Sequence, residues 1–153
     1  MAETDTLDKE MAAYQTGPLD DVKIQEALTI IAVYAAQMDH QNCEADVKRI
    51  EAILESHDLF VARKKEIFSL INKYVNEMEV RDPHKVMELA ADALAPEQKK
   101  TAFELAVKVA LPDKNLTAEK RKMLDTLKDR LSISTDFVEK EIRKQIENLQ
   151  NSP

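Results

Sequence analysis

A single glycine, Gly17, is the feature that most limits what this chain of 153 residues can fold into. Average usage would supply about ten glycines, and β-hairpins depend on glycine for their tight turns. Aromatic residues make up only 5% of the chain, so strand-forming side chains are scarce as well. Glycine-rich phosphate loops and dinucleotide-binding fingerprints are excluded, because each needs several glycines. The composition therefore predicts an all-α protein that binds no nucleotide through such a loop.

Acidic residues are concentrated in the first third of the chain. Residues 1–46 contain ten acids and two bases, whereas the remaining residues are almost balanced, and the whole chain has a formal net charge of −7. Because negative charge repels the phosphates of DNA and RNA, we expect no general nucleic-acid binding.

Three further features predict a cytoplasmic protein without direct membrane insertion. The one cysteine, Cys43, has no partner for an internal disulfide, which fits a reducing compartment. The first ten residues contain neither the basic segment nor the apolar core of a signal peptide. The longest apolar stretch, 28–36, is interrupted by Thr29 and falls short of the roughly 18 residues of a membrane span.

Apolar spacing divides the chain into a flexible acidic arm, residues 1–19, and one domain, residues 20–150. Apolar residues recur at helical spacing almost throughout this domain, and Asp, Asn, Ser and Pro mark the breaks. Ser56 or Asp58 is expected to cap the third helix, Asp82 the fourth and Thr117 the sixth. About seven helices are predicted, over residues 20–38, 43–55, 58–80, 83–94, 96–111, 118–131 and 136–149.

Two stretches of the chain share one pattern, an apolar helix followed by an Asp-led loop and a capped amphipathic helix. A shift of 74 residues superposes Ala32 on Ala106 and Asp39 on Asp113. The inner positions of the second helix correspond too, with Ile50 on Leu124. This internal repeat predicts a bundle with pseudo-twofold symmetry.

Each half of the repeat places acids near the start of its second helix. Asp39 lies in the first loop and is followed by Glu44 and Asp46, while Asp113 lies in the second loop and is followed by Glu119. Oxygen ligands of this kind suit a hard divalent cation such as calcium or magnesium. Turn formation and helix capping explain the same residues without a metal, and both interpretations stay open at this point.

The second half of the repeat resembles the TerB-like domain of the tellurite-resistance protein B family. The residues that carry the resemblance are the alanine- and valine-rich stretch 99–110, the segment Leu111-Pro112-Asp113-Lys114-Asn115-Leu116-Thr117-Ala118-Glu119-Lys120, and the ending Leu131-Ser132-Ile133-Ser134, which is similar to Leu-Gly-Leu-Ser. Residues 32–39, followed by Val47, Ile50, Ile53 and Leu54, resemble the first copy of the family pattern. The match covers roughly residues 22–137.

The resemblance implies an all-α fold of about seven helices and a cytoplasmic bacterial protein without enzyme activity. It also implies a role in tellurite or other stress resistance, protein partners in a membrane-associated complex, and a divalent cation held by clustered acids. Carried onto this chain, those acids are Asp39, Asp46, Asp113 and Glu119, with Glu44 as a substitute. The loop glycine of the family pattern is replaced by His40 in one copy and by Lys114 in the other.

Two alternatives to a metal-binding module remain. The first is a metal-free helical adaptor, in which the methionines line a groove for a partner or simply fill the core; these are Met38, Met78, Met87 and Met123. The second is a hydrolytic enzyme, but His40, His57 and His84 share no ligand spacing. The sequence therefore favours a non-enzymatic interaction module.

Overall fold

The predicted fold class is confirmed, since the described part of the protein is all-α. The structure, a computed structural model, describes residues 21–36, 43–112 and 115–151. These residues contain seven α-helices and one 3₁₀ helix, and the described ranges contain no strand. Their bounds are α2 Asp21–Ala36, α3 Cys43–Glu55, η1 Asp58–Glu66, α4 Ile67–Val80, α5 Pro83–Ala93, α6 Pro96–Ala110, α7 Ala118–Arg130 and α8 Thr135–Asn151.

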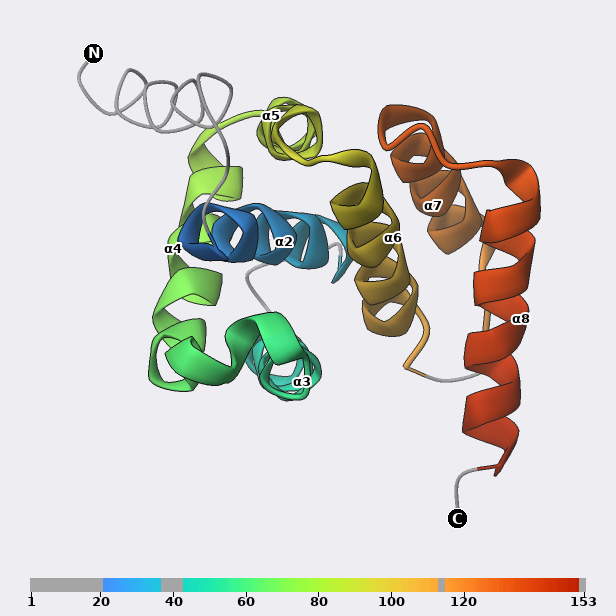
Figure 1. Cartoon of the computed structure of the whole chain (residues 1–153), viewed down its shortest axis with the longest axis horizontal. Helices are drawn as coiled ribbons and strands as arrows, with labels where there is room; N and C mark the ends of the chain where they lie inside the picture. The colour runs from blue at the N-terminus through green and yellow to red at the C-terminus, as the bar shows by residue number, and fades with distance from the viewer. Residues whose placement is uncertain (1–20, 37–42, 113–114, 152–153) are drawn as a thin grey trace.

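Helix α2 is the centre of the bundle. It packs against α3, η1, α4, α5 and α6, which surround it, whereas α7 and α8 lie on the far side of α6 (Figure 1). An apolar helix packed on all sides is the arrangement expected for a sequence that lacks a polar face. Its two buried polar side chains are satisfied: Thr29 Oγ1 donates to the carbonyl of Gln25 at 2.7 Å, and Gln25 Nε2 donates to the carbonyl of Leu59.

The buried apolar residues form one continuous cluster that runs from Ile24 to Ile142. Every helix contributes to it, including η1 through Phe60 and α8 through Val138, both 0% exposed. The predicted domain 20–150 includes this cluster, while the predicted arm, residues 1–19, lies outside the described residues.

Two of the three predicted helix caps, Asp82 and Thr117, are confirmed by hydrogen bonds. The Asp82 carboxylate accepts from the backbone N–H of His84 at 3.0 Å, with Pro83 at the first helical position. The Thr117 hydroxyl accepts from the N–H of Lys120 at 3.1 Å. These contacts satisfy backbone donors that have no partner within the helix.

The prediction for residues 58–80 is wrong in one respect, because this stretch is two elements. Residues 58–66 form the 3₁₀ helix η1, and α4 starts only at Ile67. The cap of η1 is His57, whose side chain accepts from the N–H of Leu59, while the Ser56 hydroxyl donates back to Ile53. Phe60 is buried but Val61 is 61% exposed, so the segment has too few inward residues for an amphipathic α-helix.

The helix bounds agree with the internal repeat. Shifting α2 and α3 by 74 residues gives 95–110 and 117–129, which match α6 and α7 to within one residue at each end. The equivalent inner positions Ile50 and Leu124 are both 0% exposed, and α2 packs directly on α6. The pseudo-twofold relation between the two pairs stays a prediction.

Candidate functional site

The acids predicted to bind a metal have different surroundings. Glu44 is exposed, and its carboxylate lies 3.7 Å from Lys48 Nζ. The carboxylate of Asp46 accepts a hydrogen bond of 2.7 Å from Arg49, which also donates to the carbonyl of Val109 near the end of α6. Asp46 therefore helps to hold α3 against α6. Asp39 and Asp113 lie outside the described residues.

Within residues 21–36, 43–112 and 115–151, no three His, Cys, Asp or Glu side chains gather closely enough to hold a metal ion. Glu119 does not lie with Asp46, since it lines a surface depression beside Tyr34 and His84. The predicted cation site thus depends on Asp39 and Asp113, and it stays a prediction.

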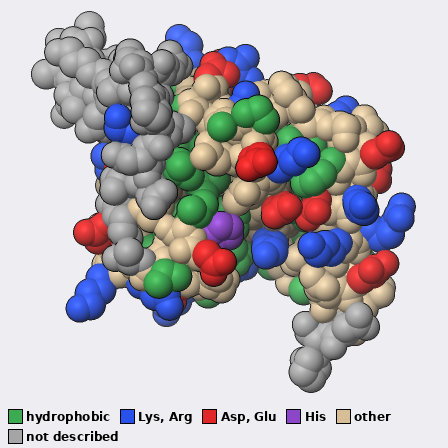
Figure 2. All heavy atoms as spheres, viewed as in Figure 1, with side chains coloured by type: hydrophobic (Ala, Val, Ile, Leu, Met, Phe, Trp, Pro, Cys, Tyr) green, Lys and Arg blue, Asp and Glu red, His purple; other side chains and the backbone are tan. Residues whose placement is uncertain are grey.

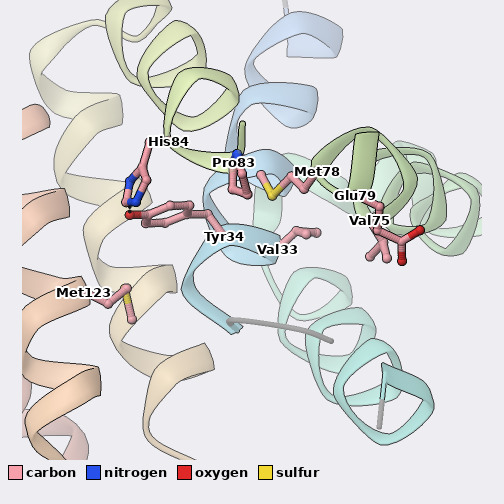
Figure 3. Close-up of a pocket in the computed structure, with 8 residues that line it drawn as sticks. All are labelled: Val33, Tyr34, Val75, Met78, Glu79, Pro83, His84 and Met123. Atoms are coloured by element: carbon pink, nitrogen blue, oxygen red, sulfur yellow. Dashed lines mark hydrogen bonds between the residues drawn. The ribbon is translucent and has the colours of Figure 1, made fainter. Parts of the chain in front are cut away.

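A hollow in the surface adjoins the depression that Glu119 lines. A depression of about 200 Å³ lies where α2, α4, α5 and α7 meet (Figure 3). Tyr34 and His84 form its polar part, together with Glu79. The rest of its lining is apolar and consists of Val33, Val75, Met78, Pro83 and Met123.

A second depression, of about 250 Å³, adjoins the first. It shares Tyr34, His84 and Met123 with the first, and α7 supplies its other lining residues, Glu119, Lys122 and Thr126. We call the two depressions together the Tyr34 groove. Residues 119, 122, 123 and 126 of α7 are spaced so that they lie on one helix face, and this face forms one wall of the groove.

A hydrogen bond between Tyr34 and His84 links α2 to α5 in the groove. The Tyr34 hydroxyl lies 2.9 Å from His84 Nδ1, and the two rings meet edge to face with centroids 5.5 Å apart. Pro83 and the Asp82 cap hold His84 in the first turn of α5. Figure 3 shows both side chains pointing toward each other.

The surroundings of Tyr34 keep its hydroxyl protonated at neutral pH. Burial raises the pKa of Tyr34 above its usual value, and the negative charges of Asp82 and Glu88 raise this pKa further. When the Tyr34 hydroxyl donates to Nδ1 of His84, the ring proton of His84 is on Nε2. The pair provides a hydrogen-bond donor at the edge of an apolar surface.

The hydroxyl groups of Tyr34 and Thr126 in the groove are poor nucleophiles. A tyrosine with a raised pKa is a weak base and a weak nucleophile at neutral pH. The hydroxyl of Thr126 donates to the carbonyl of Lys122 at 3.0 Å, as threonines on helices commonly do. Apolar walls with a few polar groups are typical of a binding surface.

Comparison of the chain with protein-family models, with curated proteins and with solved structures finds no match. The resemblance to the TerB-like domain therefore stays a prediction. In the described ranges, none of the helices combines the length and apolar character needed to span a bilayer.

No pattern in the sequence pairs His84 with Tyr34. The two residues are 50 positions apart, and only the packing of α5 on α2 brings them together. One signal was present in the sequence: Tyr34 places a polar hydroxyl at the end of an otherwise apolar helix, where a buried tyrosine usually finds a hydrogen-bond partner. Of the four methionines named as candidates for a groove, Met78 and Met123 line this one, whereas Met87 is buried in the core and Met38 lies outside the described residues.

Proposed function

We propose that this chain is a non-enzymatic, TerB-like binding module that holds a protein partner in the Tyr34 groove. The observation that carries the proposal is the apolar depression beside Tyr34 and His84. Its volume of about 200 Å³ lies below the roughly 300–1,000 Å³ of typical small-molecule sites. An engineered cavity of about 150 Å³ accommodates benzene in another protein, so this depression is large enough for one bulky apolar side chain.

The lining of the depression suits an adaptable contact. Met78 and Met123 come from different helices, and unbranched methionine side chains adjust to the shape of a bound group. His84 and Tyr34 add directed hydrogen bonding next to this surface. Such a combination fixes the orientation of a bound side chain. The apolar part of that side chain contacts the methionines, and a polar atom beside it bonds to His84 or Tyr34.

The proposed role in a stress response rests on the sequence resemblance and not on the groove. The resemblance of residues 22–137 to the TerB-like domain supports a role in a bacterial tellurite or stress response, in the cytoplasm and beside a membrane-associated complex. The proposal needs no divalent cation, because Asp46 and Glu44 already lie next to the basic side chains of Arg49 and Lys48.

Nuclear magnetic resonance of the methionine methyl groups tests use of the groove. We expect N-acetyl-leucinamide, a capped single side chain, to shift the methyl signals of Met78 and Met123 in a saturable manner. The methyl signal of Met87, which is 1% exposed in the core, should stay in place. Val75→Asp should abolish the shifts, whereas Val61→Asp, at a site 61% exposed outside the groove, should preserve them. Equal shifts in all methionines, or none, would contradict the proposal.

A calorimetric titration with calcium, magnesium, manganese and zinc tests the role of metal. We expect the binding of N-acetyl-leucinamide to be the same with each ion and with a chelator. The metal-dependent module is supported instead if a cation binds the parent protein and strengthens the binding of N-acetyl-leucinamide. Both effects should then disappear in the double variant Asp39→Asn, Asp113→Asn.

A further inference from the structure

Two large apolar side chains are exposed where η1 is followed by α4. Val61 is 61% exposed and Phe68 is 54% exposed. The exposed residues Lys64 and Lys65 lie between them along the chain. The helical rise from Val61 to Phe68 is at most about 14 Å, so one short helix can contact all four residues. We call them the η1–α4 corner, and none of them lines the Tyr34 groove.

The η1–α4 corner is basic, although the chain as a whole has a net charge of −7. Residues 58–76 contain four bases and two acids. One of these bases, Lys73, lies 3.7 Å from Glu26 of α2, whereas Lys64 and Lys65 have no carboxylate partner among the described residues. Figure 2 shows Lys and Arg side chains at the lower left edge of the molecule, the side where η1 is followed by α4 in Figure 1. The corner therefore fits a partner that is both acidic and apolar.

We propose that the acidic arm of the same chain, residues 1–19, docks on the η1–α4 corner. This inference does not depend on the proposed function, because it concerns another surface. The arm has the charge that the corner lacks, since it contains one base, Lys9, and four acids. These acids are Glu3, Asp5, Asp8 and Glu10.

The arm also has the apolar spacing that the corner requires. Leu7, Met11 and Tyr14 recur at positions i, i+4 and i+7, so they share one face of a helix. With about 100° per residue, Glu10 flanks this face and Lys9 falls on the opposite side. A docked arm therefore sets apolar side chains against Val61 and Phe68, with acids beside the two lysines.

The arm joins the body of the protein next to the corner. Helix α2 follows the arm, and within its second turn Gln25 Nε2 donates to the carbonyl of Leu59 in η1. The next residue, Glu26, lies 3.7 Å from Lys73 of α4. The first turns of α2 thus contact both elements that form the corner.

The linker is long enough for the arm to reach the corner and short enough to favour it over other occupants. Six residues separate Tyr14 from α2, and a linker of this length spans up to roughly 20 Å. Gly17-Pro18 marks a turn within it. A short linker gives the arm an effective concentration of about millimolar, so the arm of a second copy competes poorly in dilute solution.

Paramagnetic relaxation enhancement in the full chain tests the inference. A nitroxide label is attached through Ala12→Cys in a Cys43→Ser background, because Cys43 is the one native cysteine. In a helix, position 12 lies away from the apolar face of the arm. We expect the label to broaden the amide signals of Lys65 and Phe68. The signals of α8, on the opposite side of the molecule in Figure 1, should stay sharp.

Matched variants of the corner test the charge attraction. Lys64→Gln with Lys65→Gln should lower the ratio of docked to undocked arm about two- to thirtyfold, the range for two exposed ion pairs. Lys140→Gln with Lys144→Gln makes the same change of net charge at exposed sites on α8, and should leave this ratio within about twofold. Added salt should weaken the broadening in the parent protein.

Matched variants of the arm test its apolar anchors. Leu7→Asp with Met11→Asp should remove most of the broadening at the corner, because two of the three apolar side chains are lost. Thr4→Asp with Thr6→Asp adds the same negative charge and keeps all three, so the broadening should persist.

Three results would overturn the inference. Equal broadening in the parent and in Lys64→Gln with Lys65→Gln would mean that the arm passes near the corner without docking. Broadening that appears only after labelled protein is mixed with an unlabelled, isotope-enriched copy would assign the corner to a second molecule. If the label leaves Lys65 and Phe68 sharp but phosphatidylserine vesicles shift their signals, the corner binds an anionic membrane surface instead.

Discussion

The two halves of the repeat use the same helical pattern for different purposes. The pair α2–α3 and the pair α6–α7 have matching bounds under a shift of 74 residues. Arg49 of α3 is equivalent to Met123 of α7. Arg49 donates to the carbonyl of Val109 near the end of α6, whereas Met123 lines the groove beside Val33 and Tyr34 of α2. The equivalent positions 49 and 123 therefore differ in role: Arg49 holds two helices together, and Met123 lines a surface hollow.

The acids near the start of the second helix differ in the same way. Asp46 is engaged by Arg49 at 2.7 Å, so its charge is used within the fold. Glu119 is exposed and lines the groove. First-turn acids stabilise both helices through the helix dipole, but only the second half directs its acid toward a hollow. The matching helix bounds describe a shared framework, and the candidate site lies where the residues at matching positions differ.

The largest expected effect tests the shared framework. Ile50→Ala and Leu124→Ala each remove a side chain that is 0% exposed, and each should lower the free energy of unfolding by about 2–5 kcal/mol. Urea unfolding measures both. The exposed control Lys48→Ala should change it by no more than about 0.5 kcal/mol. A cost below about 1 kcal/mol at only one of the two sites would show that the halves are not equivalent in the core.

The next effect tests the structural use of position 49. Arg49→Met keeps the aliphatic part of the side chain and introduces the residue found at the equivalent position 123. It leaves the carbonyl of the buried Val109 without its donor, so we expect a loss of about 1–3 kcal/mol. Asp46→Asn, measured in the same urea experiment, should cost less because Arg49 can still reach Val109. An unchanged stability in Arg49→Met would show that this bridge does not hold α3 against α6.

The end of α7 distinguishes the halves through one backbone angle. Ser132 has φ of 56°, the only positive φ among the described non-glycine residues. The N–H groups of Ser132 and Ile133 donate to the carbonyls of Asp129 and Lys128, at 3.3 and 2.9 Å. These two bonds form a Schellman motif, whose left-handed position favours glycine.

Replacing the serine by glycine should therefore stabilise the protein. Ser132→Gly is expected to gain about 1 kcal/mol, because glycine avoids the steric cost of the left-handed conformation. Thermal or urea unfolding measures the gain. Ser132→Ala is the control and should gain nothing, because alanine retains the Cβ atom. A loss of stability in Ser132→Gly would mean that the serine hydroxyl contributes more than the backbone conformation costs.

Local sequence patterns predicted the framework well and the candidate site poorly. Apolar periodicity located the helices, and short-range capping chemistry located Asp82 and Thr117, since both depend on residues within one turn. Residues 58–66 were mistaken for α-helix because a single buried anchor, Phe60, does not distinguish an α-helix from a 3₁₀ helix. The contact between Tyr34 and His84 depends on how α2 and α5 pack, which no local pattern encodes.

The smallest effect concerns Tyr34, whose equivalent in the second half is the exposed Lys108. The pKa of Tyr34 is raised by burial and by Asp82 and Glu88, so the folded protein keeps this proton at a pH where the unfolded chain, with a tyrosine pKa of about 10, has begun to lose it. The native state then binds more protons, and stability falls with pH from about 10 up to the raised pKa. Urea unfolding measured on both sides of pH 10 should show this decline in the parent and in Lys108→Gln. The decline in stability should be shallower in Tyr34→Phe. Identical profiles of stability against pH for Tyr34→Phe and the parent would show that Tyr34 has the same pKa in the folded and unfolded states.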